Sequence, residues 1–231
     1  MSNKSAVPVH VGIILDGNRR WAKAQGLPTL EGHRQGYQTL KVIAKAAFER
    51  GVKYVTAYVF STENWNRNQK EVNYLMDFAF KAATRDLEEL HKDNIKVVWI
   101  GSADRVSEKI EKVIKKAEET TKYNTRGTIA LCFNYGGQQE LVDAVRKIIA
   151  QDLEPSEITT DNLYESLYAP EIPPIDLLIR TSGEQRLSGF MMYRATYAEL
   201  YFIDKYWPDF SSGDLDKALD EYAARERRLG R

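Results

Sequence analysis

The 231-residue sequence lacks several features by which major protein classes are recognised. It has a single cysteine, Cys132, which excludes an internal disulfide and leaves no thiolate cluster for zinc. Its 33 basic and 33 acidic residues cancel, so no overall field draws the chain to nucleic acid, and we expect no nucleic-acid partner. An anion site must therefore be a local concentration of arginine.

Long apolar runs are also missing. The first eight residues contain no apolar signal region, and no run approaches the length of a membrane span. We therefore expect a cytoplasmic protein, with residues 1–8 flexible. The hydrophobic content of 43% and charged content of 29% are ordinary for a globular protein.

Several enzyme motifs are absent as well. The chain has no Gly-x-x-x-x-Gly-Lys-Ser/Thr loop for nucleotides and no Gly-x-Gly-x-x-Gly fingerprint for dinucleotides. It has no Gly-x-Ser-x-Gly elbow for acyl transfer, and no two aspartates are adjacent. Without a cysteine nucleophile or a strong Ser-His-Asp pattern, the sequence favours catalysis by positioning and electrostatics.

The chain does contain six apolar segments that alternate with amphipathic ones. The segments predicted as strands are residues 9–15, 52–60, 95–100, 128–133, 175–179 and 200–203. The predicted helices cover residues 40–48, 72–90, 106–117, 141–149 and 215–223, with residues 152–174 as a surface connection. This alternation predicts an α/β fold: a single domain over residues 1–231 with a mostly parallel six-stranded sheet flanked by helices.

Polar residues follow four of the predicted strands. These are Asp16, residues 61–67, Asn134 and residues 180–186. The carboxyl ends of parallel strands meet at one edge of a sheet, where ligands bind. Four solvated loops are the plain alternative, but Asp, Asn, Ser and several Arg at one edge favour a polar site.

The sequence Asp-Gly-Asn-Arg-Arg-Trp at residues 16–21 is the most informative stretch. Asp16 ends a buried strand and can hold a hard cation such as Mg²⁺. Gly17 lets the backbone approach a ligand, and Arg19 and Arg20 offer donors suited to phosphate. We interpret the stretch as a metal–diphosphate corner, against the alternative of an Asp-Gly turn with solvated arginines. Arg180, with residues 186 and 188, forms a second anion-binding group.

Six motifs taken together carry a family resemblance. They are residues 16–21, Gly32-His33, Phe-Ser-Thr-Glu-Asn-Trp-Asn-Arg at 60–67, Asn-Tyr-Gly-Gly at 134–137, Arg-Thr-Ser-Gly-Glu-Gln-Arg-Leu-Ser at 180–188 and Tyr-Ala-Glu-Leu-Tyr-Phe at 197–202. From about residue 9 onward the sequence resembles the cis-prenyltransferases, and among them the bacterial undecaprenyl diphosphate synthases. The resemblance implies Mg²⁺-dependent condensation of isopentenyl diphosphate with an allylic diphosphate such as farnesyl diphosphate. The implied product is a long-chain cis-polyprenyl diphosphate; the alternative is a short- or medium-chain product.

The resemblance also implies roles for individual residues. Asp16 would hold the metal and act in catalysis, with Glu199 as a second carboxylate near it. Asn64 would take part in proton removal, orienting a water or a phosphate oxygen because an amide is a poor base. The residues implied in substrate binding are Gly17, Asn18, Arg19, Arg20, Trp21, His33, Ser61, Thr62, Glu63, Trp65, Arg67, Arg180, Arg186, Leu187 and Ser188. The alternatives are a packing role for His33 at a helix start and a core role for Trp21.

A growing isoprenoid tail requires a dry channel. The wide apolar surface of the helix predicted at 72–90 suits one wall of a hydrophobic tunnel between sheet and helices, although an ordinary buried helix shows the same pattern. Trp99 and Phe133 are candidates for its floor.

The family works as a homodimer, and Arg228-Leu229-Gly230 matches a tail motif that reaches the partner's site; the alternative is a frayed basic tail over residues 225–231. Product release would involve peripheral contact with the inner face of the membrane.

The sequence departs from the family pattern in three places, one of them a pair of residues. Thr29 stands where many relatives have a diphosphate-binding Arg, Asn68 replaces a common Pro, and Tyr193-Arg194 replace Trp-Gln. We expect these changes to affect substrate affinity, loop order and product length rather than the type of reaction.

Two other functions compete with this interpretation. A non-catalytic subunit of a heteromeric prenyltransferase keeps the fold but typically lacks the Asp-Gly-Asn motif, which is present at residue 16. An aspartate-dependent phosphohydrolase would use Asp16 as nucleophile, but such enzymes usually need a second Asp two residues on, where Asn18 lies.

Overall fold

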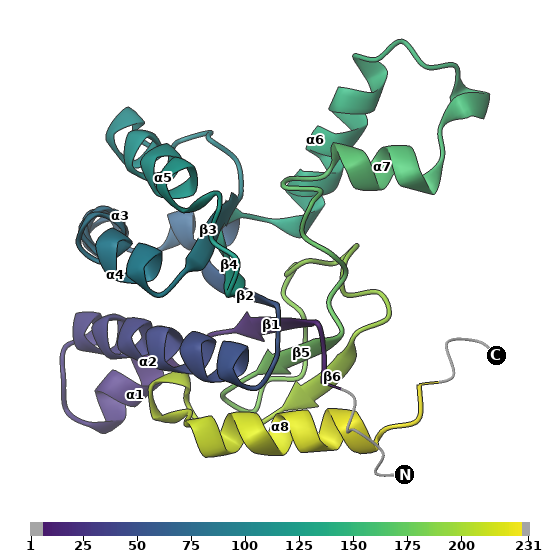
Figure 1. Cartoon of the computed structure of the whole chain (residues 1–231). Helices are drawn as coiled ribbons and strands as arrows, with labels where there is room; N and C mark the ends of the chain where they lie inside the picture. The colour runs from purple at the N-terminus through teal and green to yellow at the C-terminus, as the bar shows by residue number, and fades with distance from the viewer. Residues whose placement is uncertain (1–6, 228–231) are drawn as a thin grey trace.

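The computed structural model describes residues 7–227 and contains one six-stranded sheet (Figure 1). Its strands are β1 (His10–Ile14), β2 (Tyr54–Ser61), β3 (Ile95–Ile100), β4 (Gly127–Tyr135), β5 (Leu177–Arg180) and β6 (Glu199–Phe202). They lie in the order β3-β4-β2-β1-β5-β6, and every neighbouring pair is parallel. The predicted α/β fold and its six strands are confirmed, with a sheet that is entirely parallel.

Helices connect these strands, as a parallel arrangement requires. They are α1 (Asn18–Ala24), α2 (Thr29–Glu49), α3 (Gln69–Arg85), α4 (Leu87–Lys92), α5 (Glu108–Thr121), α6 (Gly137–Ile149), α7 (Thr160–Ser166) and α8 (Ser212–Ala224). Short 3₁₀ turns cover Thr62–Asn66 (η1), Pro155–Glu157 (η2) and Trp207–Asp209 (η3). The segment predicted as a surface connection thus contains η2 and α7, and α7 lies beside α6, away from the sheet (Figure 1).

The sheet is buried on both faces, which explains why its strands are apolar rather than alternating. All five residues of β1 are buried. On one face, Val11 and Ile13 belong to a core shared with α2, α4 and α8. On the other face, Ile14 packs in a second core that includes Phe190 and Met191 from the segment after β5.

The prediction of one continuous helix over residues 72–90 is wrong, because the helix is interrupted at Asp86. Asp86 ends α3 and precedes α4, and it accepts hydrogen bonds from Tyr37 of α2 at 2.6 Å and from Arg85 at 2.9 Å. Its side chain is buried against α2, where Lys41 lies 3.5 Å away. The apolar periodicity continues through the break, so the pattern alone gives no sign of it.

Tyr193-Arg194, one of the departures from the family pattern, contributes a buried ion pair. The guanidinium of Arg194 is 0% exposed and donates to Glu140 of α6 at 2.9 Å. It also donates to the backbone oxygens of Tyr168 and Ile172. A buried charge is tolerated only when it is paired and hydrogen-bonded, and Arg194 thereby ties the segment after β5 to α6 and to the connection before β5.

The strand order creates a switch point between β1 and β5. These strands are neighbours, with Ile14 opposite Arg180. The connection after β1 leads to β2 on one side, whereas the connection after β5 leads to β6 on the other. The two loops diverge and leave a crevice at the carboxyl ends of the strands, which is where ligands bind in open α/β sheets.

His10, fully buried at the start of β1, makes the stability of the fold depend on pH. Its Nδ1 lies 2.8 Å from the Pro173 oxygen and its Nε2 lies 2.6 Å from Thr56 Oγ1. Burial lowers the pKa of His10 from 6.5 to about 4. The unfolded chain therefore takes up a proton below pH 6.5 that the folded chain does not bind until about pH 4.

We predict that the free energy of unfolding falls as the pH drops from 6.5 toward 4. The contribution of His10 is about 3 kcal/mol at most, since one unit of pKa corresponds to about 1.4 kcal/mol. Urea unfolding across this range measures it. The slope should flatten in a His10→Gln variant and persist in His91→Gln, which changes an exposed histidine of α4. Equal slopes in the two variants would contradict the assignment.

Candidate active site

Asp16 and Arg180 meet at the ends of β1 and β5. Arg180 is only 4% exposed, and its NH2 lies 2.8 Å from Asp16 Oδ2. The other carboxylate oxygen of Asp16 accepts from Arg20 NH2 at 3.1 Å. Burial opposes ionisation of Asp16, but the hydrogen bonds and charges of Arg180 and Arg20 outweigh it and lower the pKa of Asp16. Asp16 is therefore a carboxylate at neutral pH.

Gly17 allows the backbone to turn sharply between Asp16 and the start of α1. Its φ is +103°, and a Cβ at this position would lie 2.8 Å from Cδ1 of Tyr206. A side chain would therefore be both strained and blocked. The turn allows α1 to begin directly at Asn18, so its first-turn amides lie beside Asp16. Arg20, one turn later, also contacts Glu184 at 3.2 Å.

Arg180 also organises the loop after β5. Its NH1 donates to Ser188 Oγ at 2.9 Å and to the backbone oxygen of Arg186. Arg186 is exposed and pairs with Glu184, and Leu187 packs against the apolar core beneath the loop. The buried Nε of Arg180 has no hydrogen-bond partner among the described residues. The second anion-binding group is thus assembled around Arg180 and keeps a free donor.

A polar pocket of about 780 Å³ collects the arginine-rich residues. Besides Asp16 and Gly17, its lining includes Asn18, Arg19, Arg20, Lys23, Thr29, His33 and Arg67. Its cationic side chains outnumber its carboxylates, so the pocket attracts anions although the whole chain is neutral. Thr29, where many relatives have an arginine, begins α2 at the wall of this pocket.

The η1 loop after β2 is fixed by its own side chains and by the neighbouring strand. The side-chain oxygen of Asn64 accepts from the backbone amide of Ser61 at 3.2 Å. Trp65 Nε1 donates to Asn134 Oδ1 at 2.7 Å, and the guanidinium of Arg105 lies 4.4 Å from the Trp65 ring. Asn68 then accepts from the amide of Lys70 at 2.9 Å and caps α3. Thr62 lies beside Gly136 at the end of β4, and Glu63 is exposed.

Trp21 and Glu199 are among the predicted site residues that neither contact Asp16 nor line its pocket. Trp21 Nε1 donates to Asp209 Oδ1 at 2.7 Å and ties α1 to η3, and Trp21 does not line the polar pocket. Glu199 begins β6 opposite Leu177, three residues before the position opposite Arg180. Since a strand rises about 3.3 Å per residue, this places Glu199 roughly 10 Å away along the strand. Its carboxylate accepts from Arg225 at 2.8 Å instead.

Sequence reasoning missed Glu71, a half-buried residue in the first turn of α3. Its Oε1 lies 3.1 Å from Arg67 NH1, 3.2 Å from His33 Nε2 and 3.9 Å from Arg19 Nε. Burial lowers the pKa of His33, the positive charges of Arg67 and Arg19 act in the same direction, and Glu71 opposes them. The four-residue spacing between Arg67 and Glu71 was a sequence signal for an ion pair between them. Nothing in the sequence indicated that Glu71 also contacts His33 and Arg19.

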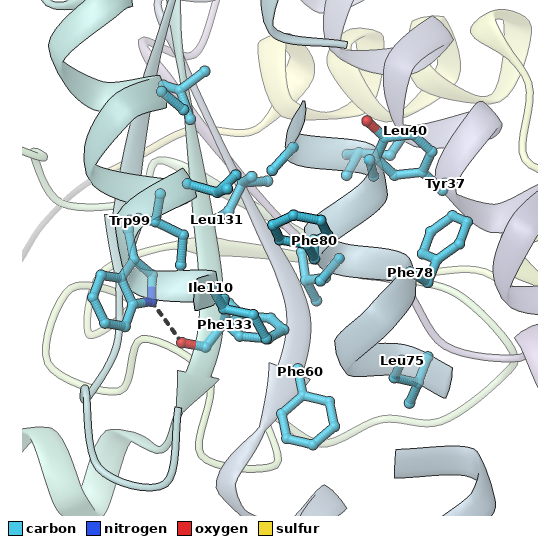
Figure 2. A pocket seen from close by; sticks show the side chains of 18 of the residues that line it. Tyr37, Leu40, Phe60, Leu75, Phe78, Phe80, Trp99, Ile110, Leu131 and Phe133 are labelled. Carbon is cyan, nitrogen blue, oxygen red and sulfur yellow. Dashed lines mark hydrogen bonds between the residues drawn. The ribbon is translucent and has the colours of Figure 1, made fainter. Parts of the chain in front are cut away.

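An apolar cavity of about 170 Å³ lies under the polar pocket, between the sheet and helices α2 to α5. Figure 2 shows its aromatic lining, with Phe60 of β2, Phe78 and Phe80 of α3, and Trp99 and Phe133 of β3 and β4. Trp99 Nε1 donates to the backbone oxygen of Phe133 at 2.7 Å. The cavity and the polar pocket share Leu15, Asn18 and His33 as lining residues.

The side chains around Asp16 suit a magnesium ion that is held jointly by the protein and a bound substrate. Within residues 7–227, no cluster of three His, Cys, Asp or Glu side chains could enclose a metal by itself. Asp16, however, presents a carboxylate in a pocket that attracts phosphate. Mg²⁺ is commonly held by one or two carboxylates together with substrate phosphates and waters. Asp16 fits that pattern.

None of the helices within residues 7–227 combines the length and apolar character needed to cross a membrane.

Comparison with known proteins identifies the family. Residues 14–230 match the prenyltransferase family model described as undecaprenyl diphosphate synthase. The trans,polycis-polyprenyl diphosphate synthase ((2Z,6E)-farnesyl diphosphate specific) of Thermobifida fusca is 44% identical over 98% of this chain and 82% of its own length. The ditrans,polycis-undecaprenyl-diphosphate synthase ((2E,6E)-farnesyl-diphosphate specific) of Micrococcus luteus is 42% identical over 99% of this chain and 93% of its own.

A solved structure shows the same fold. The lavandulyl diphosphate synthase of Lavandula x intermedia, in complex with dimethylallyl diphosphate, superposes with a TM-score of 0.93 at 36% identity. The match covers 97% of this chain and 99% of that one. The chain therefore belongs to the cis-prenyltransferase family, the family of undecaprenyl diphosphate synthase.

Proposed function

We propose that this chain is a magnesium-dependent cis-prenyltransferase that condenses isopentenyl diphosphate with an allylic diphosphate. The observation that carries the proposal is the meeting of the two cavities at Leu15, Asn18 and His33. A diphosphate in the upper pocket would have its hydrocarbon tail directed into the apolar space below. Diphosphate and hydrocarbon are the two parts of a prenyl diphosphate.

The first substrate to react is the allylic diphosphate. Breaking its C–O bond leaves negative charge on the departing diphosphate, which Arg19 and Arg20 stabilise. Asp16 would hold Mg²⁺ together with the diphosphate oxygens; when bound, the metal neutralises further charge on that leaving group. The neutral apolar lining below excludes water that would otherwise trap the reactive carbon.

The second substrate, isopentenyl diphosphate, would bind beside it. Arg180, Arg186 and Ser188 would hold its diphosphate so that its double bond faces the allylic carbon. The new carbon–carbon bond forms as the allylic bond breaks, and one proton then leaves the added unit. Asn64, supported by Ser61, would orient the water or phosphate oxygen that accepts this proton.

Two further assignments extend to a second chain. Glu199 cannot contact Asp16 of its own chain, so we propose that it serves a metal site only within the expected homodimer. The tail motif Arg228-Leu229-Gly230 lies outside the described residues, and its role in a partner's site stays a prediction, as does contact with a membrane.

The apolar cavity limits the length of hydrocarbon tail that fits without a change in the structure. An apolar cavity of about 150 Å³ holds one benzene-sized molecule, and the cavity under Asp16 measures about 170 Å³. It therefore accommodates few isoprene units, whereas a long-chain product would need a much larger space. The relatives named as polyprenyl and undecaprenyl diphosphate synthases are 44% and 42% identical to this chain, so the long-chain product stays part of the proposal and would require the cavity to widen as the tail grows.

The proposed reaction can be tested with purified protein, isopentenyl diphosphate, Mg²⁺ and dimethylallyl, geranyl or farnesyl diphosphate. We expect elongated cis-prenyl diphosphates, and no product when a chelator removes Mg²⁺. Asp16→Asn should lower kcat by about 10²–10³-fold, as loss of one group that stabilises charge in the transition state typically does. Mass spectrometry of the product and assay of free phosphate provide the measurement.

Controls separate loss of chemistry from loss of fold. Asp77→Asn removes an exposed carboxylate of α3, paired with Lys81, and should leave the rate unchanged. Arg20→Gln changes a partly exposed side chain and should lower the rate even if Asp16→Asn proves unstable. Phosphate release without elongation would instead favour the hydrolase, and neither product would favour the non-catalytic subunit.

We predict that Phe133→Ala and Trp99→Ala lengthen the product by one or more isoprene units. Each substitution enlarges the apolar cavity at its β3–β4 wall, so that a longer tail fits before the product dissociates. Phe133→Ala also costs stability, about 3–5 kcal/mol for a buried aromatic residue, and Trp99→Ala costs less because Trp99 is only partly buried; assays therefore belong well below the melting temperature. Tyr123→Ala, at a residue that is 83% exposed, is the matched control. An unchanged chain-length distribution in both variants would refute the assignment.

A further inference from the structure

We infer that Glu71 is a positioning residue for the allylic diphosphate site, holding Arg19, His33 and Arg67 in place from behind the pocket. The inference rests on the proposed function, since these three residues line the polar pocket assigned to that diphosphate. Glu71 itself does not line the pocket. It would act through its neighbours rather than on the substrate.

The contacts show a single carboxylate oxygen where three structural elements converge. Arg19 comes from α1, His33 from α2, and Arg67 from the two-residue link between η1 and α3. All three have a side-chain nitrogen within 3.9 Å of Glu71 Oε1, with Arg67 at 3.1 Å. Helices α1 and α2 already pack on each other, so the contact with Glu71 serves to tie Arg67 and the first turn of α3 to that pair.

Burial makes this contact stronger than a surface ion pair. The Glu71 side chain is 11% exposed and that of Arg67 is 28% exposed. Exposed ion pairs contribute little because water screens them, whereas a partly buried guanidinium without its carboxylate is costly. Without Glu71, the Arg67 side chain would lose this partner and turn toward solvent.

The geometry also leaves the remaining donors free for a ligand. Glu71 engages one terminal nitrogen of Arg67, and no described residue accepts a hydrogen bond from the other two. Burial favours the neutral form of His33. Its Nε2–H then donates to Glu71, which fixes the tautomer of the ring.

Glu71 should not repel the substrate strongly. Its charge is offset by Arg67 at hydrogen-bond distance and by Arg19 nearby. It also lies in the first turn of α3, where the helix dipole stabilises a carboxylate. Loss of Glu71 should therefore weaken diphosphate binding through disorder of the donors, rather than strengthen it by removing a negative charge.

The test compares Glu71→Gln with the unaltered protein. Gln keeps the shape and one acceptor but removes the charge. We expect binding of farnesyl thiodiphosphate, an unreactive allylic analogue, to weaken about tenfold or more in calorimetry, since hydrogen bonds to charged groups are worth about 1.5–3 kcal/mol. The KM for the allylic diphosphate should rise in parallel, and the KM for isopentenyl diphosphate should stay within about twofold of the unaltered value.

The matched control is Glu108→Gln, which removes an exposed first-turn glutamate of α5 that pairs with Lys112 four residues later. It should change neither KM. Glu71→Asp, which keeps the charge on a shorter side chain, should restore part of the lost affinity. General destabilisation of the fold would not raise the KM for the allylic diphosphate while leaving the KM for isopentenyl diphosphate unchanged.

The outcomes separate this inference from the proposed function. Equal weakening for both substrates, unchanged binding or tighter binding in Glu71→Gln would overturn the role of Glu71 alone, provided that the unaltered protein binds the analogue and elongates substrate. If the unaltered protein neither binds the analogue nor forms product, the proposed function fails, and the inference fails with it.

Discussion

The ion pair between Asp16 and Arg180 is the interaction on which the rest of the site depends. A guanidinium that is only 4% exposed requires a charged partner, and the neighbouring strand end supplies it. The pair can form only because β1 and β5 are adjacent and parallel, with Ile14 opposite Arg180. Through Ser188 and the backbone of residue 186, Arg180 then fixes the loop after β5. Sheet topology thereby decides where two distant anion-binding segments meet.

Helix α3 joins the polar and apolar halves of the site within one element. Its first turn carries Glu71, which contacts Arg19, His33 and Arg67 of the polar pocket, while Phe78 and Phe80 further along line the apolar cavity. Such a helix needs polar residues at one end and an unusually wide apolar surface along its body. That division explains why its apolar residues extend beyond a single stripe: the helix lines a cavity instead of packing solidly on the sheet.

Sequence reasoning located the strand ends well because parallel strands buried on both faces read as continuous apolar runs. Asp16 and Arg180 could be placed together since each directly follows such a run. Glu199 received its metal role from the family resemblance alone; the predicted strand at 200–203 already put it at the amino end of that strand, and it begins β6 in the structure. The break at Asp86 and the role of Glu71 depend on contacts with α2, and no local pattern records contacts between helices distant in sequence.

Burial also divides the site's ion pairs into two kinds. Arg180 to Asp16 and Arg194 to Glu140 involve guanidinium groups hidden from water, so breaking either pair would strand a buried charge. Arg20 to Glu184 and Arg186 to Glu184 are partly exposed, and water screens them. In the proposed function, an incoming diphosphate would take over Arg20 and Arg186 at little cost, whereas Arg180 would stay bound to Asp16. The same residue type thus supplies a fixed frame and exchangeable ligand contacts, and solvent exposure determines which role each arginine has.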